Sequence, residues 1–323
     1  MSSTQTLSSL SICGRLTLNM HSLNNEGGEG NQILTRQVTI VDKQGEISTV
    51  NAVSGDMLKH IQAEHLWQVS HEQNIKLCSA CNNFNANRIT ASGEFVKTFD
   101  RNTPDSEVLD LLVSSCAIDD LEGILVTNHN KNVPRKSCAE FGWLVALPNN
   151  SKTQNYFHVK YVSDAGSAQG DEEGANIGQN IFHRPANSGI YALVTNFDLF
   201  RIGYNDISKK YVINDEARTR RYRAFLQSIL YTFIKPKGAM RNTQNPHIVD
   251  FQGLISTSSR AIPAPTLSPL NKDYVSEMEK ITSSLNTIEN DAISIMAFSS
   301  LSEFSEKMAS LINGSQPYKL KEN

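Results

Sequence analysis

The chain has 323 residues, of which 39% are hydrophobic and 20% are charged, and its formal net charge is −3. This content suffices to bury a core, as one elaborated domain or two modest ones. No apolar run approaches the roughly 20 residues of a membrane span, and the N-terminus lacks the basic start of a signal peptide. We therefore expect a soluble, cytoplasmic protein with no membrane partner. The net charge by itself argues against a nucleic-acid binder, since a phosphate-binding domain usually carries an excess of Lys and Arg.

The first element is a strand over residues 10–21, where apolar and polar residues alternate. This period of two predicts one buried face and one polar face. Asn19 and His21 would lie on the polar face, where the strand runs into the glycine-rich turn 24–31. A histidine in such a place is usually an ordinary surface residue.

Residues 37–41 and 46–50 flank a short loop that ends in glycine, and this pattern predicts a hairpin. The chain then breaks at Ser54-Gly55 and continues as a helix. Ser54 can cap the helix, Gly55 would let another chain approach the backbone, and Lys59 and His60 follow about one turn later. Such a helix start suits the phosphate of a nucleic-acid backbone, although Ser-Gly before a helix is often only a cap.

Residues 70–115 read as an insertion that carries the Cys78-x-x-Cys81 pair. A structural zinc site requires four ligands, and the further candidates Cys116 and Cys138 are not paired in the sequence. The odd total of five cysteines also does not suit a disulfide framework. We therefore expect no metal and no cofactor.

Strands resume at 123–127 and 141–147, and a further strand pair, 156–162 and 190–197, encloses the polar, glycine-rich stretch 164–174. This stretch predicts a protruding arm. Its far shoulder carries Phe182 and Arg184, an aromatic and a cation that can stack on a base, although a plain strand shoulder gives the same pattern.

The clearest helix is capped by Asn214 or Asp215 and ends at Lys235-Pro236, with arginines placed off its apolar stripe. Residues 201–241 hold ten Lys and Arg against three acids, so the basic charge is local and can follow a phosphate backbone. The glycine-containing loop 237–241 follows this helix. Its backbone amides could meet a phosphate while Lys237 and Arg241 neutralise it.

Three segments together resemble the DevR-like, Cas-seven family, the repeated backbone subunit of type I CRISPR effector complexes. These are Asn19-Met20-His21-Ser22, Val53-Ser54-Gly55-Asp56-Met57-Leu58-Lys59 and Lys237-Gly238-Ala239-Met240-Arg241. The resemblance runs in order across most of residues 7–257 and is closest to the I-B branch.

The resemblance implies an α+β fold with a ferredoxin-like RNA-recognition (RRM/RAMP) core, βαββαβ, and large insertions that give a hand-like shape. On this chain the palm would span residues 1–69 and 116–257 and the finger insertion residues 70–115. Residues 163–187 would form the thumb arm, and residues 258–323 a C-terminal helical extension.

The resemblance also implies the function of a non-catalytic scaffold. Copies of it would form a helical filament along the CRISPR RNA (crRNA) and present this guide for pairing with target DNA, in antiviral defence or RNA-guided transposon targeting. The implied partners are crRNA, other copies of the chain, the large subunit, the cap subunit, the crRNA-processing endonuclease and target DNA in the R-loop. A transposition adaptor is a further candidate partner.

The resemblance places RNA contacts on the palm helix, the glycine-rich loop, the end of the first strand and a basic residue before the palm helix. With the arm shoulder, the predicted RNA-binding set is Asn19, His21, Arg36, Ser54, Gly55, Lys59, His60, Phe182, Arg184, Lys237, Gly238, Met240 and Arg241. His60 stands where relatives often carry Arg, and imidazole is largely neutral at pH 7. No aromatic RNP1-like run is visible, so we expect the grip to come from phosphates and shape.

Two other functions compete. An endoribonuclease of the same superfamily would use His21 or His60 as acid or base, or a carboxylate such as Glu26 or Glu29, but His21 has no evident second histidine partner. A transcriptional or developmental regulator would need a helix-turn-helix or a similar base-reading element, and none stands out.

Overall fold

The computed structural model describes residues 5–161 and 179–321, so most of the predicted thumb arm lies outside the described residues. The fold is mixed, with helices packed on a ten-stranded, largely antiparallel sheet, which confirms the predicted α+β class. The main strand order is β15-β14-β2-β11-β10-β6-β5. These strands are β15 (Ile293–Phe298), β14 (His247–Ser258), β2 (Ser9–His21), β11 (Gln179–Asp198), β10 (Leu144–Tyr161), β6 (Ile47–Val53) and β5 (Gln37–Val41).

The centre of the sheet has four neighbouring positions. Three of them are β14, β2 and β11, and the fourth, beside β11, is shared by β9 (Ala139–Phe141) and the start of β10. Every neighbouring pair among them is antiparallel. In the chain, α1 (Gly55–Glu72) lies between β2 and β9, and α6 (Asp215–Ile234) lies between β11 and β14. The two helices pack on each other and, with α8 (Leu301–Gly314), cover one face of the sheet.

Both faces of β2 are buried in its first half, so the predicted wet face is wrong there. Ile12 belongs to the main core, whereas Cys13 packs with Leu254, Tyr274 and Met278 on the other face. The Ser11 hydroxyl donates a hydrogen bond of 2.8 Å to the Ala264 carbonyl. The cover comes from the proline-rich segment 261–269 and from α7 (Tyr274–Glu289), which are remote in sequence.

The alternation of β2 reverses at its end because the strand carries a bulge. Leu18 pairs with Gly189 and His21 with Asn187, so β2 has one more residue than β11 over this stretch. Met20 takes a left-handed φ of +56° and is exposed, whereas His21 is buried. The prediction that His21 projects from the polar face is therefore wrong.

Helix α6 begins and ends as predicted. The Asn214 side chain caps it by accepting a hydrogen bond of 2.8 Å from the Ala217 amide. Two of its arginines are nevertheless buried: Arg221 donates to Asp120 at 2.8 Å, and the Arg218 Nε donates to the Ile202 carbonyl at 2.8 Å. These two arginines serve internal contacts, so part of the basic charge predicted to follow a phosphate backbone is not at the surface.

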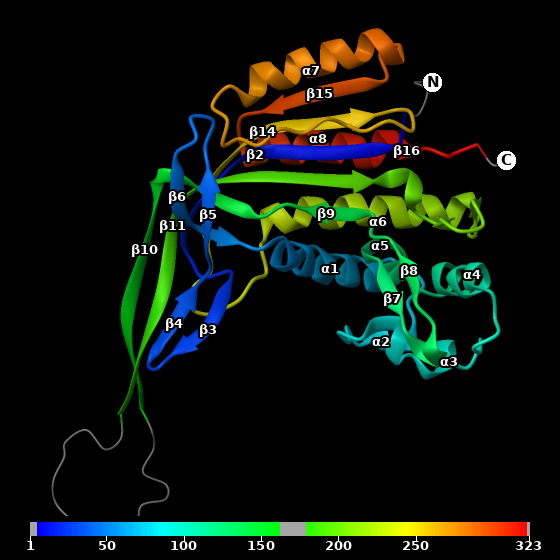
Figure 1. Ribbon diagram of the computed structural model, residues 1–323, viewed down its shortest axis with the longest axis horizontal. Coiled ribbons are helices and arrows are strands. Elements are labelled where there is room, and N and C mark those ends of the chain that lie inside the picture. Colours follow the sequence, from blue (N-terminus) through cyan, green and yellow to red (C-terminus); the bar gives the residue numbers. More distant parts are fainter. Residues whose placement is uncertain (1–4, 162–178, 322–323) are drawn as a thin grey trace, which may run out of the picture.

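The remaining elements complete the layout (Figure 1). The hairpin β5–β6 forms as predicted, and the hairpin β10–β11 extends away from the helices, beside the smaller hairpin of β3 (Asn25–Glu29) and β4 (Gln32–Thr35). The predicted C-terminal helical extension contains α7 and α8 but also the strand β15, which was not predicted. No helix in residues 5–161 and 179–321 is long and apolar enough to span a membrane.

Further short helices and two-stranded pairs lie in residues 79–135, in residues 204–211 and near the two ends of the chain. They are α2 (Ser79–Asn82), a 3₁₀ helix (Arg88–Ala91), α3 (Gly93–Val96), α4 (Asp105–Ser115), α5 (Ala117–Glu122), β7 (Ile124–Val126) paired with β8 (Val133–Arg135), β12 (Tyr204–Asn205) paired with β13 (Lys210–Tyr211), and β1 (Gln5–Leu7) paired with β16 (Ser315–Pro317).

Candidate nucleic-acid interface

The three segments singled out in the sequence meet at Leu23 and Asn24, just after β2. The Asn24 Oδ1 accepts a hydrogen bond of 2.7 Å from the Ser54 amide, at the start of α1. The Leu23 carbonyl accepts one of 3.1 Å from the Ala239 amide, in the glycine-containing loop. The role of these two residues was not predictable from the sequence, because it depends on contacts with segments that are distant along the chain.

Ser54 and Gly55 are buried at this junction. The Ser54 hydroxyl caps α1 by accepting from the Met57 amide at 3.2 Å, as predicted. The chain that approaches Gly55 is the protein's own β9, since a Cβ on Gly55 would overlap the carbonyl oxygen of Phe141. The prediction that Gly55 opens the backbone to another molecule is therefore wrong: Gly55 lets β9 pack against the helix start.

The loop after α6 is docked in the same way. A Cβ on Gly238 would lie 2.6 Å from the Leu23 Cδ2, so glycine is required for packing here. Lys237 is buried, and its Nζ lies 3.1 Å from Glu64 Oε1, so its charge is already opposed. Arg241 lies 3.6 Å from the same oxygen, but its side chain is 41% exposed. Of the two predicted phosphate-neutralising cations, Arg241 is the accessible one.

Four predicted residues from two elements line one hollow of about 400 Å³, which we call the loop hollow. Its lining residues are Arg184, Gly238, Met240, Arg241, Asn242 and Thr243. Arg184 comes from β11 and donates to the Thr243 hydroxyl at 3.2 Å. Within the described residues, the backbone N–H groups of Arg241 and Asn242 donate no hydrogen bond. The residues that line the loop hollow thus carry two guanidinium groups, two backbone amides without a partner, a hydroxyl and a carboxamide, which are groups that bind anions.

An aromatic surface adjoins this hollow on β11. The Arg184 guanidinium lies 4.8 Å from the Phe182 ring centre. The Phe182 ring stacks on His158 of β10, with 5.7 Å between the ring centres and an interplanar angle of 13°. The predicted pairing of an aromatic with a cation is present, in a geometry that leaves Phe182 half-buried.

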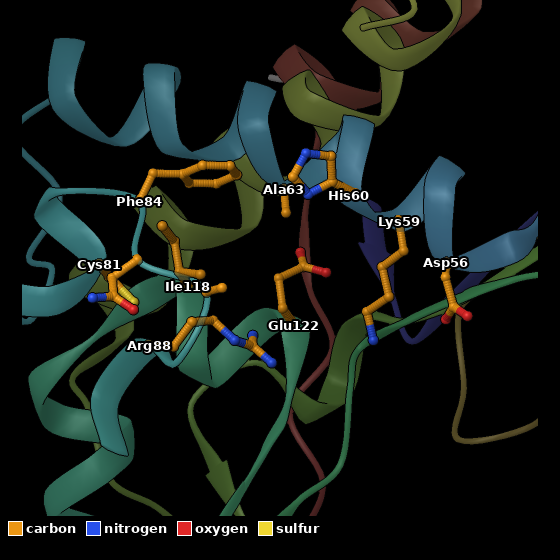
Figure 2. A pocket seen from close by; sticks show the side chains of 11 residues that line it. Asp56, Lys59, His60, Ala63, Cys81, Phe84, Arg88, Ile118 and Glu122 are labelled. Atoms are coloured by element: carbon orange, nitrogen blue, oxygen red, sulfur yellow. The ribbon is translucent and has the colours of Figure 1, made fainter. Parts of the chain in front are cut away.

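Lys59 and His60 line a second hollow, of about 300 Å³, which we call the helix hollow (Figure 2). Phe84, Arg88 and Glu122 face them from the insertion and α5. Both carboxylate oxygens of Glu122 are buried without a hydrogen-bond partner among the described residues, and burial raises the pKa of Glu122 to about 7. The helix hollow therefore mixes cations with a poorly solvated acid and is less suited to a phosphate than the loop hollow.

His21 lies in a buried hydrogen-bond network behind the surface. Its Nε2 is 2.8 Å from the Tyr191 hydroxyl, which in turn donates to Asn51 Oδ1 at 2.8 Å. Burial lowers the pKa of His21 to about 3, so its imidazole is neutral at pH 7. A neutral, inaccessible histidine can neither contact RNA nor act as a general acid at that pH.

Arg36 and Asn19 lie outside both hollows. Arg36 pairs with Glu26 and lies over Trp143, with 5.3 Å between its guanidinium carbon and the ring centre. Asn19 is half-buried opposite His247 of β14. The pair with Glu26 reduces the free charge of Arg36 and engages one of the two carboxylates that the endoribonuclease alternative would use.

Comparison with known proteins adds to this geometry. Residues 12–279 match the family described as "CRISPR-associated negative auto-regulator DevR/Csa2". The chain is 26% identical over 297 residues to "CRISPR-associated protein Cas7/Cst2/DevR" of Methanocaldococcus jannaschii, covering 87% of this chain and 88% of that protein.

Two solved structures are also similar to the chain. One is a chain of a "CRISPR RNA-guided surveillance complex, pre-nicking", with 12% identity, a TM-score of 0.48 and coverage of 97% of this chain and 96% of that chain. The other is a chain of a "CRISPR RNA-guided surveillance complex", with 13% identity, a TM-score of 0.48 and coverage of 97% and 95%.

Proposed function

Since this chain belongs to the DevR/Csa2 family of CRISPR-associated proteins, we propose that it is a non-catalytic backbone subunit that binds crRNA by its sugar-phosphate chain. The observation that carries the proposal is the loop hollow, which Arg184 and Arg241 line and where the backbone amides of Arg241 and Asn242 have no hydrogen-bond partner among the described residues. Contacts of this kind fix the position of a strand without reading its bases. A guide-binding subunit must accept any guide sequence and leave base edges free for pairing.

The order of the central elements supports a ferredoxin-like RNA-recognition core. The sequence β2-α1-β9/β10-β11-α6-β14 has the βαββαβ pattern, and its central strands lie in the order 4-1-3-2. We assign this core to the palm, residues 70–115 to the finger insertion and residues 163–187 to the thumb arm. Residues 258–323 form the C-terminal extension, which packs against the palm through β15 and α8.

Within the loop hollow the two arginines take different roles. Arg241 is exposed and meets a phosphate from the loop, assisted by the amides of Arg241 and Asn242. Arg184 meets the neighbouring phosphate or base from β11, where Phe182 offers a ring face for stacking. Met240 has a left-handed φ of +58°, and this turn of the backbone orients the Arg241 side chain and the amides of Arg241 and Asn242.

The other predicted residues take secondary roles. Lys59 and His60 contact the RNA strand further along α1, and Asn19 and Arg36 lie at the edges of the path of this RNA. Ser54, Gly55, Lys237, Gly238 and His21 hold the corner together from inside and act as positioning residues.

The subunit works as one copy among several. Copies align along one crRNA in a type I, I-B-like complex with a large subunit, a cap subunit and a processing endonuclease, and the guide pairs with target DNA in the R-loop. The complex acts in antiviral defence or, with a transposition adaptor, in transposon targeting. The non-catalytic assignment rests on the burial of His21 and on the Glu26–Arg36 pair.

The test compares Arg184→Gln and Arg241→Gln with the control Arg260→Gln. Arg260 is exposed and follows the end of β14 opposite to His247, far from the loop hollow. With labelled RNAs of three unrelated sequences, we expect each hollow variant to bind about tenfold more weakly to all three, and the control to bind as the wild type does.

The same assay reads the fate of the RNA in the presence of divalent metal. We expect the RNA to stay intact and to be protected in periodic blocks. Cleavage that a Glu26→Ala or His60→Ala variant abolishes would instead establish the endoribonuclease. Weakening confined to one RNA sequence would contradict a grip through the backbone.

A further inference from the structure

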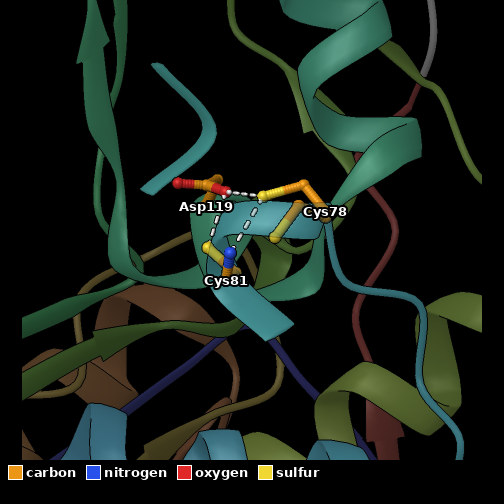
Figure 3. Close-up of side chains that lie close together, drawn as sticks. Cys78, Cys81 and Asp119 are labelled. Atoms are coloured by element: carbon orange, nitrogen blue, oxygen red, sulfur yellow. Dashed lines mark hydrogen bonds between the residues drawn. The ribbon is translucent and has the colours of Figure 1, made fainter. Parts of the chain in front are cut away.

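Three cysteines and an aspartate come together where α2 of the insertion packs near α5, beside the helix hollow. They are Cys78, Cys81, Cys116 and Asp119, all buried, and their Sγ and carboxylate oxygen atoms lie within 4.8 Å of one another. The Sγ atoms of Cys78 and Cys81 are 3.6 and 3.2 Å from Asp119 Oδ2 (Figure 3). Cys13 and Cys138, the other two cysteines, do not belong to this cluster.

The cluster is built from two copies of the same local arrangement. Cys78 is the residue before α2 and Cys81 is its third residue. Cys116 is the residue before α5 and Asp119 is its third residue. The Cys81 amide donates a hydrogen bond of 3.3 Å to the Cys78 Sγ, so the Cys78 side chain caps the start of α2 and lies close to Cys81. Two short helices therefore present two donors each to a common centre.

The spacing suits a metal ion better than a disulfide or an ordinary core. Ligand atoms of a tetrahedral zinc site lie about 3.5 to 3.8 Å apart, given Zn–S and Zn–O lengths of about 2.3 and 2.1 Å. The four donor atoms here approach this arrangement together, whereas a disulfide would join two sulfurs and leave a third thiol and a carboxylate buried. The neighbouring cation, Arg88, keeps its Nε 4.0 Å from Asp119 Oδ1, too far for a close hydrogen bond.

We propose that Cys78, Cys81, Cys116 and Asp119 bind one structural Zn²⁺ ion. Thiolate-rich, four-donor sites select zinc, and a closed set of four protein ligands is typical of a structural site. This proposal replaces the expectation of no metal. From the sequence, Cys116 is one of two unpaired candidates beside the first pair, and Asp119 is not recognisable as a ligand until α5 lies beside α2.

The ion would lie behind the wall of the helix hollow that faces α1. Cys81 lines that hollow together with Phe84, Arg88 and Glu122, which face Lys59 and His60 across it. Binding of zinc would hold α2 against α5 and so fix the surface that the insertion presents to α1. The ion would thus stabilise the insertion. Binding of the ion does not depend on the proposed RNA contacts.

The test measures zinc in the purified full-length chain after expression with added Zn²⁺. We expect about one zinc per chain by mass spectrometry of the metal, and about a tenth of that in Cys78→Ser and Cys116→Ser. Cys138→Ser is the matched control, because Cys138 is fully buried and lies beside α5 but outside the cluster. This control should keep its zinc.

A second measurement decides the case if the cluster variants fail to fold. Wild-type protein reconstituted with Co²⁺ should show the absorption of a tetrahedral ion with thiolate charge-transfer bands for three sulfurs. Asp119→Asn should keep these bands but bind the metal at least tenfold more weakly. Folded wild-type protein that takes up neither zinc nor cobalt would overturn the proposal, as would zinc that persists in folded Cys78→Ser and Cys116→Ser.

Discussion

Arg184 and Arg241 line a hollow, whereas several other cations of this chain are buried in internal contacts with carboxylates or carbonyls. Arg218 and Arg221 are buried in such networks, and Lys237 is held by Glu64. Counting charges along residues 201–241 therefore overstates the basic surface. Which arginine is free depends on the elements packed around it.

At the residue scale, Arg184→Gln should lower the salt dependence of RNA binding. Each phosphate contact with a single strand contributes a slope of about −0.7 to the plot of log affinity against log salt. We expect the slope to become shallower by about that amount and to be unchanged in Arg260→Gln. An unchanged slope in Arg184→Gln would show that this arginine does not neutralise a phosphate.

His21 should make folding stability sensitive to acid. Its pKa is lowered to about 3 in the fold from an ordinary 6.5, so below pH 6.5 the unfolded chain binds a proton that the folded chain does not. His21→Gln should cost about 1 to 3 kcal/mol at pH 7, through the lost contact with Tyr191. This cost should shrink by about 1 kcal/mol at pH 5.5, measured by urea unfolding. A cost independent of pH would show that His21 is not buried in its neutral form.

Glu122 should act in the opposite direction. Burial raises its pKa to about 7 from an ordinary 4.5, so the folded chain binds the extra proton and stability falls as the pH rises from about 4.5 to 7. Glu122→Gln should stabilise the protein by about 1 to 3 kcal/mol at pH 8 and have little effect at pH 4.5. The exposed Glu46→Gln is the control. Equal destabilisation by Glu122→Gln at both pH values would indicate a charged carboxylate engaged by Lys59 and Arg88.

At the scale of elements, the sequence pattern predicted the helices and hairpins that are determined by interactions between residues close together in the chain. The hairpin β5–β6 and the cap and length of α6 follow from turn residues, side-chain caps and helical spacing within a few residues. The burial of both faces of β2 and the edge strand β15 did not, because both depend on packing between the two ends of the chain. In the candidate site, the segments of the loop hollow were predicted but their joint at Leu23 and Asn24 was not.

The joint between α1 and β9 offers a matched pair of substitutions. Gly55 and Gly93 are each the first residue of a helix capped by a serine, but only Gly55 faces a backbone carbonyl, that of Phe141. Gly55→Ala should lower the free energy of unfolding by about 2 to 4 kcal/mol, because β9 must move to admit the methyl group. Gly93→Ala, with open space around it, should change stability by less than about 0.5 kcal/mol. Equal effects would show that β9 does not press on the start of α1.

At the scale of the whole molecule, α1 connects the two hollows. Lys59 and His60 line the helix hollow, and Glu64, one turn later, pairs with Arg241 of the loop hollow. Residues of one helix therefore contact or line both hollows. The hairpin β10–β11, which carries Arg184, extends away from the helices (Figure 1). This layout suits the proposed path of a single RNA strand, from the helix hollow to the loop hollow.

The most direct test is an electron cryomicroscopy map of the protein assembled on crRNA. Our account predicts phosphates within hydrogen-bond reach of Arg241 and Arg184 in every copy, with base edges turned away from the loop hollow. RNA bound along another face, such as α7 and β15, with the loop hollow empty of nucleotide, would contradict it.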